Sequence, residues 1–324
     1  MSTDALSDIF KAVRLTGAAF FDVAASGRWC AEQPSRELVL RKVMPGADRL
    51  ISYHVVVEGE CYATMIGGEP LHLDPGEVIV YTRGDPHVMA SAPGLRALRP
   101  TQAEFDAMTT GPQPFIVRLG DGEQPTAKLV CGFLACDSRP YNPLFDNLPP
   151  VITARRSGDS GASWLAKFIG VAVAETLNRR AGGEGVLARL SELMLIEVVR
   201  RYVEGLPPGQ SGWLAGLRDP FVGKSLALLH AHAARPWTIE DLAREVGLSR
   251  SVLAERFADL VGLPPMHYLA HWRMQIAAGR LCDGGSNIAV IASEAGYGSE
   301  AAFSRAFKKL VGLPPSEWRR RKAS

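Results

Sequence analysis

No stretch of this 324-residue chain contains the roughly 20 uninterrupted apolar residues that are needed to cross a lipid bilayer. Its opening residues, MSTDALSDIFKAVRL, also lack the order of a signal peptide, in which basic residues precede an apolar segment and small residues. These two absences argue against a membrane or exported protein. We therefore expect a cytoplasmic protein with no membrane partner.

Cysteine is scarce, and the five cysteines show no CxxC spacing. In a cytoplasmic protein we expect them to be thiols or metal ligands rather than disulfides. The sequence also lacks a Ser/His/Asp arrangement and a glycine-rich phosphate-binding loop, the patterns that mark many hydrolases and nucleotide-dependent enzymes. We therefore expect that the protein is not an enzyme.

The charge is nearly balanced overall, at a formal net +2, but it is unevenly distributed. Residues 1–215 carry 21 Lys and Arg against 24 Asp and Glu, whereas residues 216–324 carry 15 against 10. The basic C-terminal third suits a polyanionic partner. The length exceeds what one hydrophobic core usually serves, and 47% of the residues are apolar, so we expect two domains with buried cores.

The first 150 residues consist of short β-prone runs separated by turns such as GGEP, DPGE and RGDP. Strands at such regular spacing indicate an antiparallel sandwich or barrel. The hydrophilic stretch RRSGDSGAS at 155–163 interrupts this pattern, so we place the first domain at 1–155. The β-prone runs are Ile51–Val57, Cys61–Ile66, Leu71–Leu73, Val78–Thr82 and Lys128–Leu134.

After the break, apolar residues follow helical spacing, with a bend at RRAGGEG. This spacing predicts a helical hairpin over 163–204. The hairpin either packs on its own β domain or forms a dimer interface, because an exposed helical pair is common in two-fold symmetric interfaces. We expect a homodimer. The segment GLPPGQSG then reads as a linker, and the helical remainder gives a domain at 216–324.

An internal repeat is the most informative feature of the chain. Residues 242–265 read LAREVGLSRSVLAERFADLVGLPP, and residues 291–315 read IASEAGYGSEAAFSRAFKKLVGLPP. Each copy pairs a short helix with a glycine, Gly247 or Gly296, that supplies the positive φ needed to turn the chain. A second amphipathic helix follows the turn. Short helices joined by glycine turns are typical of helix-turn-helix motifs.

We predict two such motifs, at 238–261 and 287–311, with a long helix over Pro264–Leu281 between them. A helix of that length would hold two recognition helices in successive major-groove segments, roughly 34 Å apart. Small and polar residues on each recognition helix would approach base edges, and basic residues would bind phosphates. The predicted DNA-contacting residues are Arg250, Ser251, Ala254, Glu255, Arg256, Arg273, Ser299, Glu300, Ala301, Ser304, Arg305 and Lys308, with Lys309 as a further phosphate contact.

The second copy of the repeat matches the signature IAxxxGYxSxxxFSRxFKKxxGxxPxxxR at Ile291, Ala292, Gly296, Tyr297, Ser299, Phe303, Ser304, Arg305, Phe307, Lys308, Lys309, Gly312, Pro315 and Arg319. In this respect residues 220–322 resemble the DNA-binding domain of the AraC/XylS family of bacterial transcription regulators. The resemblance implies two helix-turn-helix motifs that read double-stranded DNA early in each second helix. The first recognition helix departs from the expectation, because it carries serine and alanine where a long side chain could reach a base.

Residues 58–87 are similar to the cupin barrel of many AraC-type sensor domains, in the order turn, strand, PGE turn, strand, GDPH. The resemblance implies a small β-barrel whose mouth can hold a ligand. Enzymatic cupins usually hold a metal through an HxH pair, a glutamate and a later histidine. Only His87 has a counterpart here, because no HxH is present and Ser52 occupies the glutamate position.

The polar residues of this domain support two alternatives. His54 has the side-chain parity of Ser52, so it should face the interior together with His87. Two imidazoles and two thiolates would suit a tetrahedral zinc ion, and that set is His54, Cys61, His87 and Cys131. A pocket for an organic effector is the alternative, lined by His54, Tyr62, Tyr81 and His87.

Together these features predict an α+β protein with an N-terminal cupin-like β-barrel, a helical linker hairpin and a C-terminal all-α double helix-turn-helix domain. We expect a sequence-specific DNA-binding transcription regulator whose barrel senses a small molecule or a metal. RNA polymerase is a further expected partner if the regulator is an activator. Two alternatives stay open: a metal-dependent cupin enzyme fused to a DNA-binding module, and a regulator whose cysteines sense oxidants.

Overall fold

The structure is a computed structural model, and contacts between residues divide it into two compact units. The β unit comprises Leu15–Asp137 and Pro149–Glu204, and the helical unit comprises Met1–Arg14, Ser138–Leu148 and Gly205–Ser324. The residues that the structure describes are 5–12, 15–45, 47, 49–136, 140–155, 170–172, 174, 175, 178, 181–207 and 209–322.

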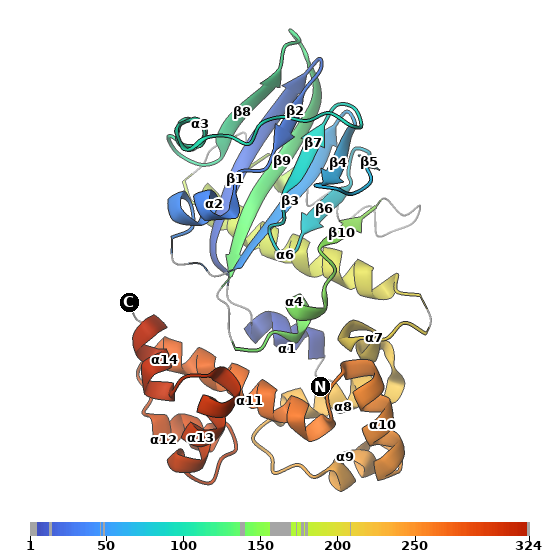
Figure 1. The fold of residues 1–324 in the computed structure, drawn as a ribbon, viewed down its shortest axis with the longest axis vertical. Coiled ribbons are helices and arrows are strands. Elements are labelled where there is room, and N and C mark those ends of the chain that lie inside the picture. The colour runs from blue at the N-terminus through green and yellow to red at the C-terminus, as the bar shows by residue number, and fades with distance from the viewer. Residues whose placement is uncertain are drawn as a thin grey trace. The chain divides into compact units, whose positions relative to one another are not determined.

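The β unit contains two sheets (Figure 1). The strands of the larger sheet are β1 (Leu15–Ser26), β3 (Arg49–Glu58), β6 (Val78–Tyr81), β8 (Phe115–Gly120), β9 (Pro125–Cys136) and β10 (Val151–Ala154). Their order is β10-β6-β3-β9-β1-β8. The strands of the smaller sheet are β2 (Cys30–Glu32), β4 (Cys61–Met65), β5 (Leu71–Leu73) and β7 (His87–Ala90), in the order β2-β7-β4-β5.

The predicted α+β class is confirmed, but the predicted barrel is corrected. Among the described residues the strands form two separate sheets, and no closed barrel is present. The β2 and β5 strands at the edges of the smaller sheet have three residues each, so they offer few backbone groups for closing the two sheets into one. The larger sheet is mixed, because β8 pairs with β1 in parallel while β9 pairs with β1 antiparallel.

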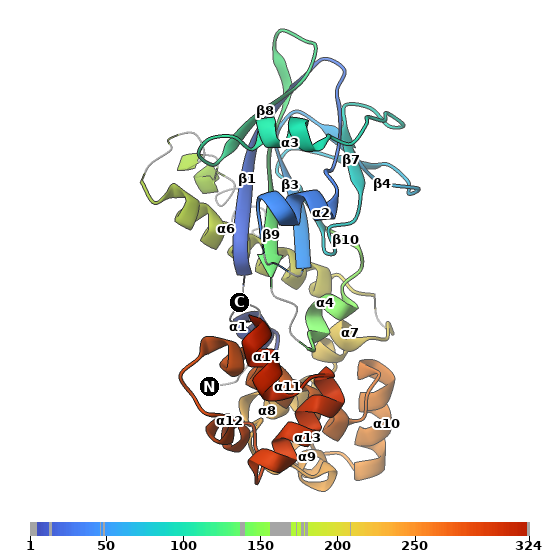
Figure 2. The same ribbon diagram turned by 60° about the vertical axis from the view of Figure 1, so that its left-hand side comes forward.

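Among the described residues, the helices of the β unit include α2 (Arg36–Lys42), α3 (Gln102–Met108) and α6 (Gly183–Glu204). Helix α6 runs across one face of the larger sheet (Figure 2), where Tyr53 and Ser191 share a hydrogen bond of 2.9 Å between their hydroxyl oxygens. Helix α6 covers the second half of the segment, 163–204, that was predicted to form a helical hairpin. Most of the first half of that segment lies outside the described residues, so the hairpin itself stays a prediction.

The helical unit holds both halves of the sequence repeat. Its helices are α1 (Ala5–Ala12), α4 (Pro143–Asn147), α7 (Trp213–Arg218), α8 (Pro220–Ala231), α9 (Ile239–Val246), α10 (Arg250–Val261), α11 (Pro265–Asp283), α12 (Ile288–Glu294), α13 (Glu300–Val311) and α14 (Pro315–Lys322). Figure 1 shows α11 between the group α7–α10 and the group α12–α14. Helices α1 and α4 come from the part of the sequence predicted as the first domain, yet their residues Ile9, Leu144 and Phe145 are buried within this unit.

Buried polar groups join α7, α8 and α11. The Trp213 indole Nε1 donates to the Tyr268 hydroxyl at 3.0 Å, and that hydroxyl lies 2.7 Å from Nε2 of His230. Burial lowers the pKa of His230 to about 3, so its imidazole is neutral and Nε2 accepts from Tyr268. The second group of helices packs around Phe303 and Phe307, both fully buried. Each helix-turn-helix motif therefore has its own core.

Candidate nucleic-acid interface and an apolar cavity

The first helix-turn-helix motif is defined by its caps. The Thr238 side chain accepts from the backbone N–H of Asp241 at the start of α9, and the Ser249 side chain accepts from that of Val252 at the start of α10. Between them Gly247 adopts φ +83°, the left-handed conformation that ends α9. Gly247 therefore determines where α9 ends, and Ser249 determines that α10 begins at Arg250.

The second motif follows the same scheme. Asn287 caps α12 and Ser299 caps α13, while Gly296 adopts φ +79° in the turn. The turn also packs against the segment between α8 and α9, because a Cβ at Gly296 would lie 2.6 Å from the carbonyl oxygen of Ala234. Glycine is needed here both for the backbone conformation and for the close approach.

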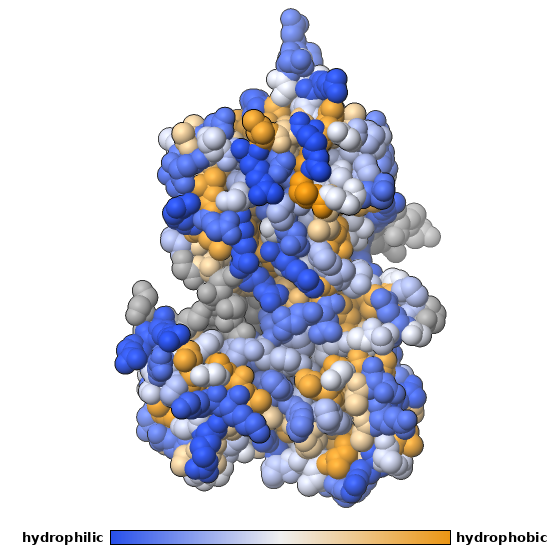
Figure 3. Space-filling view, viewed as in Figure 1, coloured by the Kyte–Doolittle hydropathy of each residue, from blue (hydrophilic) through white to orange (hydrophobic). Residues whose placement is uncertain are grey.

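The predicted DNA contacts are mostly accessible. Within this set, Arg250, Ser251, Glu255, Arg256, Ser299, Glu300, Ala301, Arg305 and Lys308 are exposed, and Ala254, Arg273 and Ser304 are half-buried. In the view of Figure 3, hydrophilic residues cover most of the helical unit, with small scattered hydrophobic areas. Such a surface is suited to a polar, charged partner.

Two arginines of α10 already have acidic partners. Nη1 of Arg250 lies 2.9 Å from Oε1 of Glu240, which is on α9. Nε of Arg256 lies 2.9 Å from Oδ2 of Asp219, the residue that caps α8. The positive charge of the first recognition helix is therefore largely balanced within the unit.

Arg273 of α11 links the two motifs. Its Nε donates to the carbonyl of Ala233 at 2.7 Å and its Nη2 to the carbonyl of Arg235 at 2.8 Å. Its guanidinium carbon also lies 5.8 Å from the ring centroid of Tyr297, in the second turn. Burial lowers the pKa of Arg273, although the group keeps its charge. The side chain therefore has a structural role in addition to its predicted phosphate contact.

The second recognition helix is different. Within the described part of the chain, the side chains of Arg305, Lys308 and Lys309 have neither a hydrogen-bond partner nor an ion-pair partner, and all three residues are exposed. Because a free cation releases condensed counterions when it meets a phosphate, α13 offers the stronger electrostatic attraction to DNA.

An apolar cavity of about 110 Å³ lies in the β unit, bordered by both sheets and by α3. Its walls are mostly apolar, and its polar residues are Glu32, Gln33, His54 and His87. The other lining residues are Phe21, Val23, Trp29, Ala31, Pro34, Met89, Pro100, Phe105, Met108, Val117, Leu119, Leu129, Cys131, Gly132 and Phe133. Closely spaced apolar walls with a few polar groups are typical of small-molecule sites.

The two histidines of the cavity form a hydrogen bond, with their Nε2 atoms 2.7 Å apart. Burial lowers the pKa of His87 to about 4. Burial also lowers the pKa of His54 well below 6.5, and the neighbouring imidazole of His87 lowers it further. Both rings are therefore neutral at pH 7. Nδ1 of His87 donates to the carbonyl of Asp85 at 2.9 Å, so its Nε2 accepts from Nε2–H of His54. Nδ1 of His54 is then a buried acceptor without a partner among the described residues.

The four residues of the predicted zinc set are only partly brought together. His54 and Cys131 are cross-strand partners on β3 and β9, and both line the cavity with His87. Cys61 pairs with Leu73 in the smaller sheet and does not line the cavity. Burial raises the pKa of Cys61 to about 12 and that of Cys131 well above 9, so both are neutral thiols in the metal-free protein. The HxH pair and glutamate of metal-binding cupins are also missing from the sequence, so these residues do not fit such a metal centre.

Of the predicted effector residues, only two line the cavity. His54 and His87 do, whereas Tyr81 lies behind them and stacks on His87 with ring centroids 3.5 Å apart. Tyr62 packs against His72 in the smaller sheet, with ring centroids 5.0 Å apart. The apolar wall was missed from the sequence, although the alternation of Leu129, Cys131 and Phe133 along one strand is a signal of a shared face.

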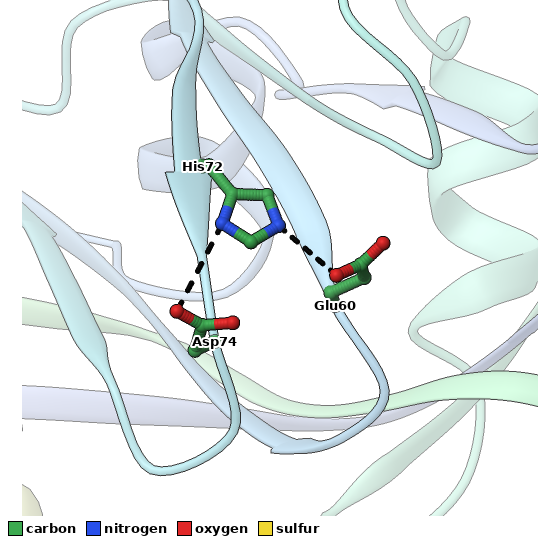
Figure 4. A group of neighbouring side chains, drawn as sticks. All are labelled: Glu60, His72 and Asp74. Carbon is green, nitrogen blue, oxygen red and sulfur yellow. Dashed lines mark hydrogen bonds and ion pairs between the residues drawn. The ribbon is translucent and has the colours of Figure 1, made fainter.

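A separate group of potential ligands lies on the smaller sheet (Figure 4). Nε2 of His72 is 3.1 Å from Oε2 of Glu60, and its Nδ1 is 3.9 Å from Oδ2 of Asp74. The two carboxylates approach opposite nitrogens of one ring, so the three side chains do not converge on one point. Their arrangement is that of a surface ion-pair network.

Two helix-turn-helix motifs with exposed basic residues define a DNA-binding protein as a class. The family comparisons agree, because a cupin family model matches residues 4–204 and a helix-turn-helix domain model matches residues 242–321. A putative AraC-like transcription regulator of Streptomyces lividans is 32% identical over 319 residues, which cover 98% of each chain. The chain belongs to the family of AraC-like, DNA-binding transcription regulators, as the sequence predicted.

Other known proteins are similar over almost the whole chain or over about a third of it. The HTH-type transcriptional regulator AlkR of Acinetobacter baylyi is 28% identical over 319 residues, covering 98% of this chain and 99% of AlkR. The C-terminal domain of AraT, a response regulator from Geobacillus stearothermophilus, is 30% identical with a TM-score of 0.31, covering 32% of this chain and 86% of that one. Among the described residues, no helix is long and apolar enough to cross a membrane.

Proposed function

We propose that this regulator reads its DNA site mainly through α13, with α10 in a supporting role. The observation that carries the proposal is the difference in charge pairing. Arg305, Lys308 and Lys309 are exposed and unpaired, whereas Arg250 and Arg256 of α10 are held by carboxylates. Arg305, early on the helix, would make directional hydrogen bonds to a base edge, and the two lysines would bind phosphates.

The remaining predicted contacts would complete the interface. Helix α11 would keep both recognition helices on one side of the duplex, so that they enter successive major-groove segments. The side chains early on the two helices would then face base edges, with α10 making closer, shorter contacts through its small residues. Those side chains are Ser251, Ala254 and Glu255 on α10, and Ser299, Glu300, Ala301 and Ser304 at α13.

Selection of binding sites from random DNA tests this assignment. The purified full-length protein should enrich one sequence, and fluorescence anisotropy should give a lower Kd for that duplex than for a scrambled one. An Arg305→Ala variant should enrich a more degenerate site, whereas Arg250→Ala should leave the enriched sequence closer to that of the wild type. If Arg250→Ala instead selects a more degenerate site than Arg305→Ala does, the leading role of α13 is contradicted.

We further propose that the cavity of the β unit binds a small-molecule effector, which changes the affinity of the helical unit for DNA. A ligand shifts such an equilibrium only by the difference in its binding free energy between two states. The support is the apolar cavity, whose few polar lining residues include His54 and His87. Measuring DNA affinity with and without a bound ligand tests the coupling.

The histidine pair and the buried cysteines of the β unit argue against a metal-dependent cupin enzyme and against a cysteine-based sensor. The Nε2 atoms of His54 and His87, 2.7 Å apart, hydrogen-bond directly to each other, so this pair is satisfied without a metal. The neutral, buried thiols of Cys61 and Cys131 are slow to oxidise, because the thiolate is the reactive form. We therefore propose a regulator rather than a cupin enzyme or a cysteine-based sensor.

We also propose that the protein acts as a homodimer in the cytoplasm, and that RNA polymerase is its partner if it activates transcription. The support for a dimer is on α6, where Val186 and Leu193 are 41% and 48% exposed and lie seven residues apart on one side of the helix. Light scattering should give the mass of a dimer, and Leu193→Lys should shift it toward the monomer. An unchanged mass would place the dimer interface elsewhere.

A further inference from the structure

The two recognition helices carry opposite charges at equivalent positions. Counted from the capping residues of α10 and α13, Glu255 and Arg305 stand at the same position. We propose that Glu255 reads a cytosine, by accepting a hydrogen bond from its amino group in the major groove, and that it excludes guanine and thymine from that position of the DNA site. This inference rests on the DNA-binding role proposed for the helical unit, and it adds the identity of one base.

The carboxylate of Glu255 has no partner in the helical unit. Most of the described carboxylates of this unit form ion pairs, as those of Asp219 and Glu240 do with arginines of α10. Within the described residues, the side chains of Glu255, Asp259 and Glu300 form neither a hydrogen bond nor an ion pair. Glu300 is the first residue of α13, where a negative charge is favourable for the helix dipole. Glu255 lies in the middle of α10, where the dipole gives it no such role.

The neighbours of Glu255 on its own helix do not explain the residue either. Stabilising ion pairs on a helix form between residues three or four positions apart. The residues of α10 at these spacings are Ser251, Val252, Ala258 and Asp259. None of them is basic, and Asp259 has the same charge as Glu255, so the pair slightly destabilises the helix. Folding therefore gains nothing from this carboxylate, which is exposed and available to a ligand.

The charge on this face of α10 does not suit a phosphate contact. One turn beyond Glu255 and Arg305, Asp259 of α10 is equivalent to Lys309 of α13. Helix α13 thus presents two cations at the positions where α10 presents two carboxylates. Carboxylates are repelled by phosphates, so Glu255 and Asp259 lower the affinity of α10 for any duplex. A favourable contact of Glu255 with DNA therefore requires a hydrogen-bond donor on a base.

Two of the four bases present a donor in the major groove. Cytosine offers its N4 amino group, and adenine offers its N6 amino group beside the acceptor N7, whereas guanine and thymine offer acceptors. An ionised carboxylate accepts hydrogen bonds and donates none. The carboxylate of Glu255 is therefore attracted to cytosine, less to adenine because of N7, and repelled by guanine and thymine. The guanidinium of Arg305 has the opposite preference, for guanine.

The residues around Glu255 allow α10 to approach the bases closely. Ala254 is small and half-buried, and Ser251, one turn before Glu255, is small and exposed. Small side chains early on a recognition helix let it lie deep in the major groove. The longer side chain of Glu255 can then extend to a base edge. In this arrangement α10 contributes one specific contact to a site that α13 binds more strongly.

Site selection followed by single-base substitution tests this inference. The full-length protein selects its site from random DNA, and fluorescence anisotropy gives the Kd of duplexes that carry each base at each selected position. At one cytosine, replacement by guanine or thymine should raise the Kd of the wild type roughly 5- to 150-fold, and Glu255→Ala should reduce this ratio to about twofold or less. Glu255→Ala should also bind a scrambled duplex more tightly than the wild type, because repulsion from phosphates is relieved.

Two further changes identify the hydrogen bond. N4-methylcytosine still pairs with guanine but carries a methyl group in place of the major-groove N–H, so at this position it should weaken binding of the wild type and leave Glu255→Ala unaffected. Glu255→Gln should prefer adenine there, because an amide can bind N6 and N7 of adenine together.

Asp259→Ala is the matched control for these variants. It removes the same charge from the same face of α10, one turn away, so it should strengthen binding to all duplexes alike and leave the cytosine preference unchanged. Circular dichroism and thermal unfolding establish that each variant is folded.

The outcomes separate this inference from the leading role proposed for α13. The assignment of Glu255 is overturned if Glu255→Ala keeps every base preference, if the responding base is not cytosine, or if Asp259→Ala relaxes the same position. It is also overturned if methylation weakens the wild type and Glu255→Ala alike, or if Glu255→Gln still prefers cytosine. In each case a site that Arg305→Ala makes degenerate leaves the role of α13 standing.

The converse result is equally distinct. If Glu255→Ala relaxes a cytosine but Arg305→Ala leaves the selected site unchanged, the assignment of Glu255 stands and the leading role of α13 fails. A wild-type protein that enriches no sequence overturns both.

Discussion

Arg256 on the first recognition helix donates two hydrogen bonds to one oxygen, Oδ2 of Asp219, while the other oxygen caps α8. That cap consists of bonds from the backbone N–H groups of Phe221 and Val222. Burial opposes ionisation of Asp219, but the hydrogen bonds from Arg256 and from the backbone outweigh it, so the pKa of this carboxyl is lowered. One carboxylate thus joins α10 to the start of α8.

Replacing Asp219 should therefore destabilise the helical unit in two ways. Asp219→Ala removes both the cap and the partner of Arg256, and we expect the free energy of unfolding to fall by about 1–2 kcal/mol. Asp219→Asn keeps an acceptor for the cap and should cost less. Urea unfolding followed by circular dichroism measures both. Asp259→Ala, at an exposed position of α10, is the control, and an equal loss in that variant would refute the role of the cap.

Arg305 and Lys308 should differ in how they affect DNA binding. Arg305→Ala should lose about 1–3 kcal/mol of discrimination between the selected and a scrambled duplex, because a base contact is removed. Lys308→Ala should weaken binding to both duplexes alike and reduce the slope of log Kd against log salt by about one, because a phosphate contact is removed. Anisotropy titrations at several salt concentrations separate the two effects.

Arg256→Ala supplies the comparison for these two variants. Its guanidinium is held by Asp219, so we expect a smaller change in the salt slope than for Lys308→Ala, even though the sequence predicted a phosphate contact at both positions. Equal slopes for the two variants would show that Arg256 leaves its carboxylate when DNA binds. Equal losses on both duplexes for Arg305→Ala would refute its assignment as a base reader.

The helix-turn-helix motifs were predictable because their signals are local. Thr238, Ser249 and Ser299 each cap a helix through a backbone group three positions away, and Gly247 and Gly296 turn the chain by their own φ. Such features need no knowledge of distant residues. The same reasoning placed the strands that became β3, β4, β5, β6 and β9.

The cavity and the charge pairs depend on residues that are far apart in the sequence. Phe21, Phe105 and Phe133 meet at one wall although more than 100 positions separate the first from the last. The ion pair of Arg256 with Asp219 likewise spans 37 positions. The alternation of side chains along a strand predicted that His54 and His87 face the same interior. It did not exclude Cys61 from the same site, because alternation gives the face on which a residue lies and not its position along the strand.

Gly247 and Gly296 occupy equivalent turns, but they should respond differently to alanine. Both have positive φ, so each Gly→Ala change carries a backbone cost of about 1–2 kcal/mol. A Cβ at Gly247 meets nothing within 4 Å, whereas one at Gly296 would lie 2.6 Å from the oxygen and 2.9 Å from the Cα of Ala234. Backbone atoms must then move, so Gly296→Ala should be clearly the more destabilising of the two.

The Gly296 contact also joins the two motifs, since Ala234 lies directly after α8 and beside the carbonyl groups that Arg273 binds. Gly296→Ala should therefore weaken DNA binding beyond its effect on folding, by shifting α13 relative to α10. Anisotropy at a temperature where both variants are folded measures this, with Gly247→Ala as the matched control. If Gly296→Ala and Gly247→Ala have equal stabilities and equal affinities for DNA, the turn at Gly296 accommodates a Cβ without the predicted cost.

The histidine pair of the cavity predicts a dependence of stability on pH. The pKa of His87 is lowered to about 4 in the folded protein, against about 6.5 in an unfolded chain, and that of His54 is lowered as well. The unfolded chain then binds more protons than the folded one below about pH 6.5. The contribution of the two neutral histidines to the free energy of unfolding is therefore fully present above about pH 6.5, and it is lost as the pH falls toward 4.

Unfolding by urea at pH 7.5, 6.5, 5.5 and 5.0 measures this loss. Each such histidine contributes a slope approaching about 1.4 kcal/mol per pH unit below pH 6, so His87→Phe should flatten the profile of the wild type by roughly that amount. Met89→Leu is the control, because it alters the same cavity wall without removing a titratable group. If His87→Phe lowers stability by the same amount at every pH, the imidazole of His87 is not kept neutral by burial, and the acceptor assigned to Nδ1 of His54 loses its basis.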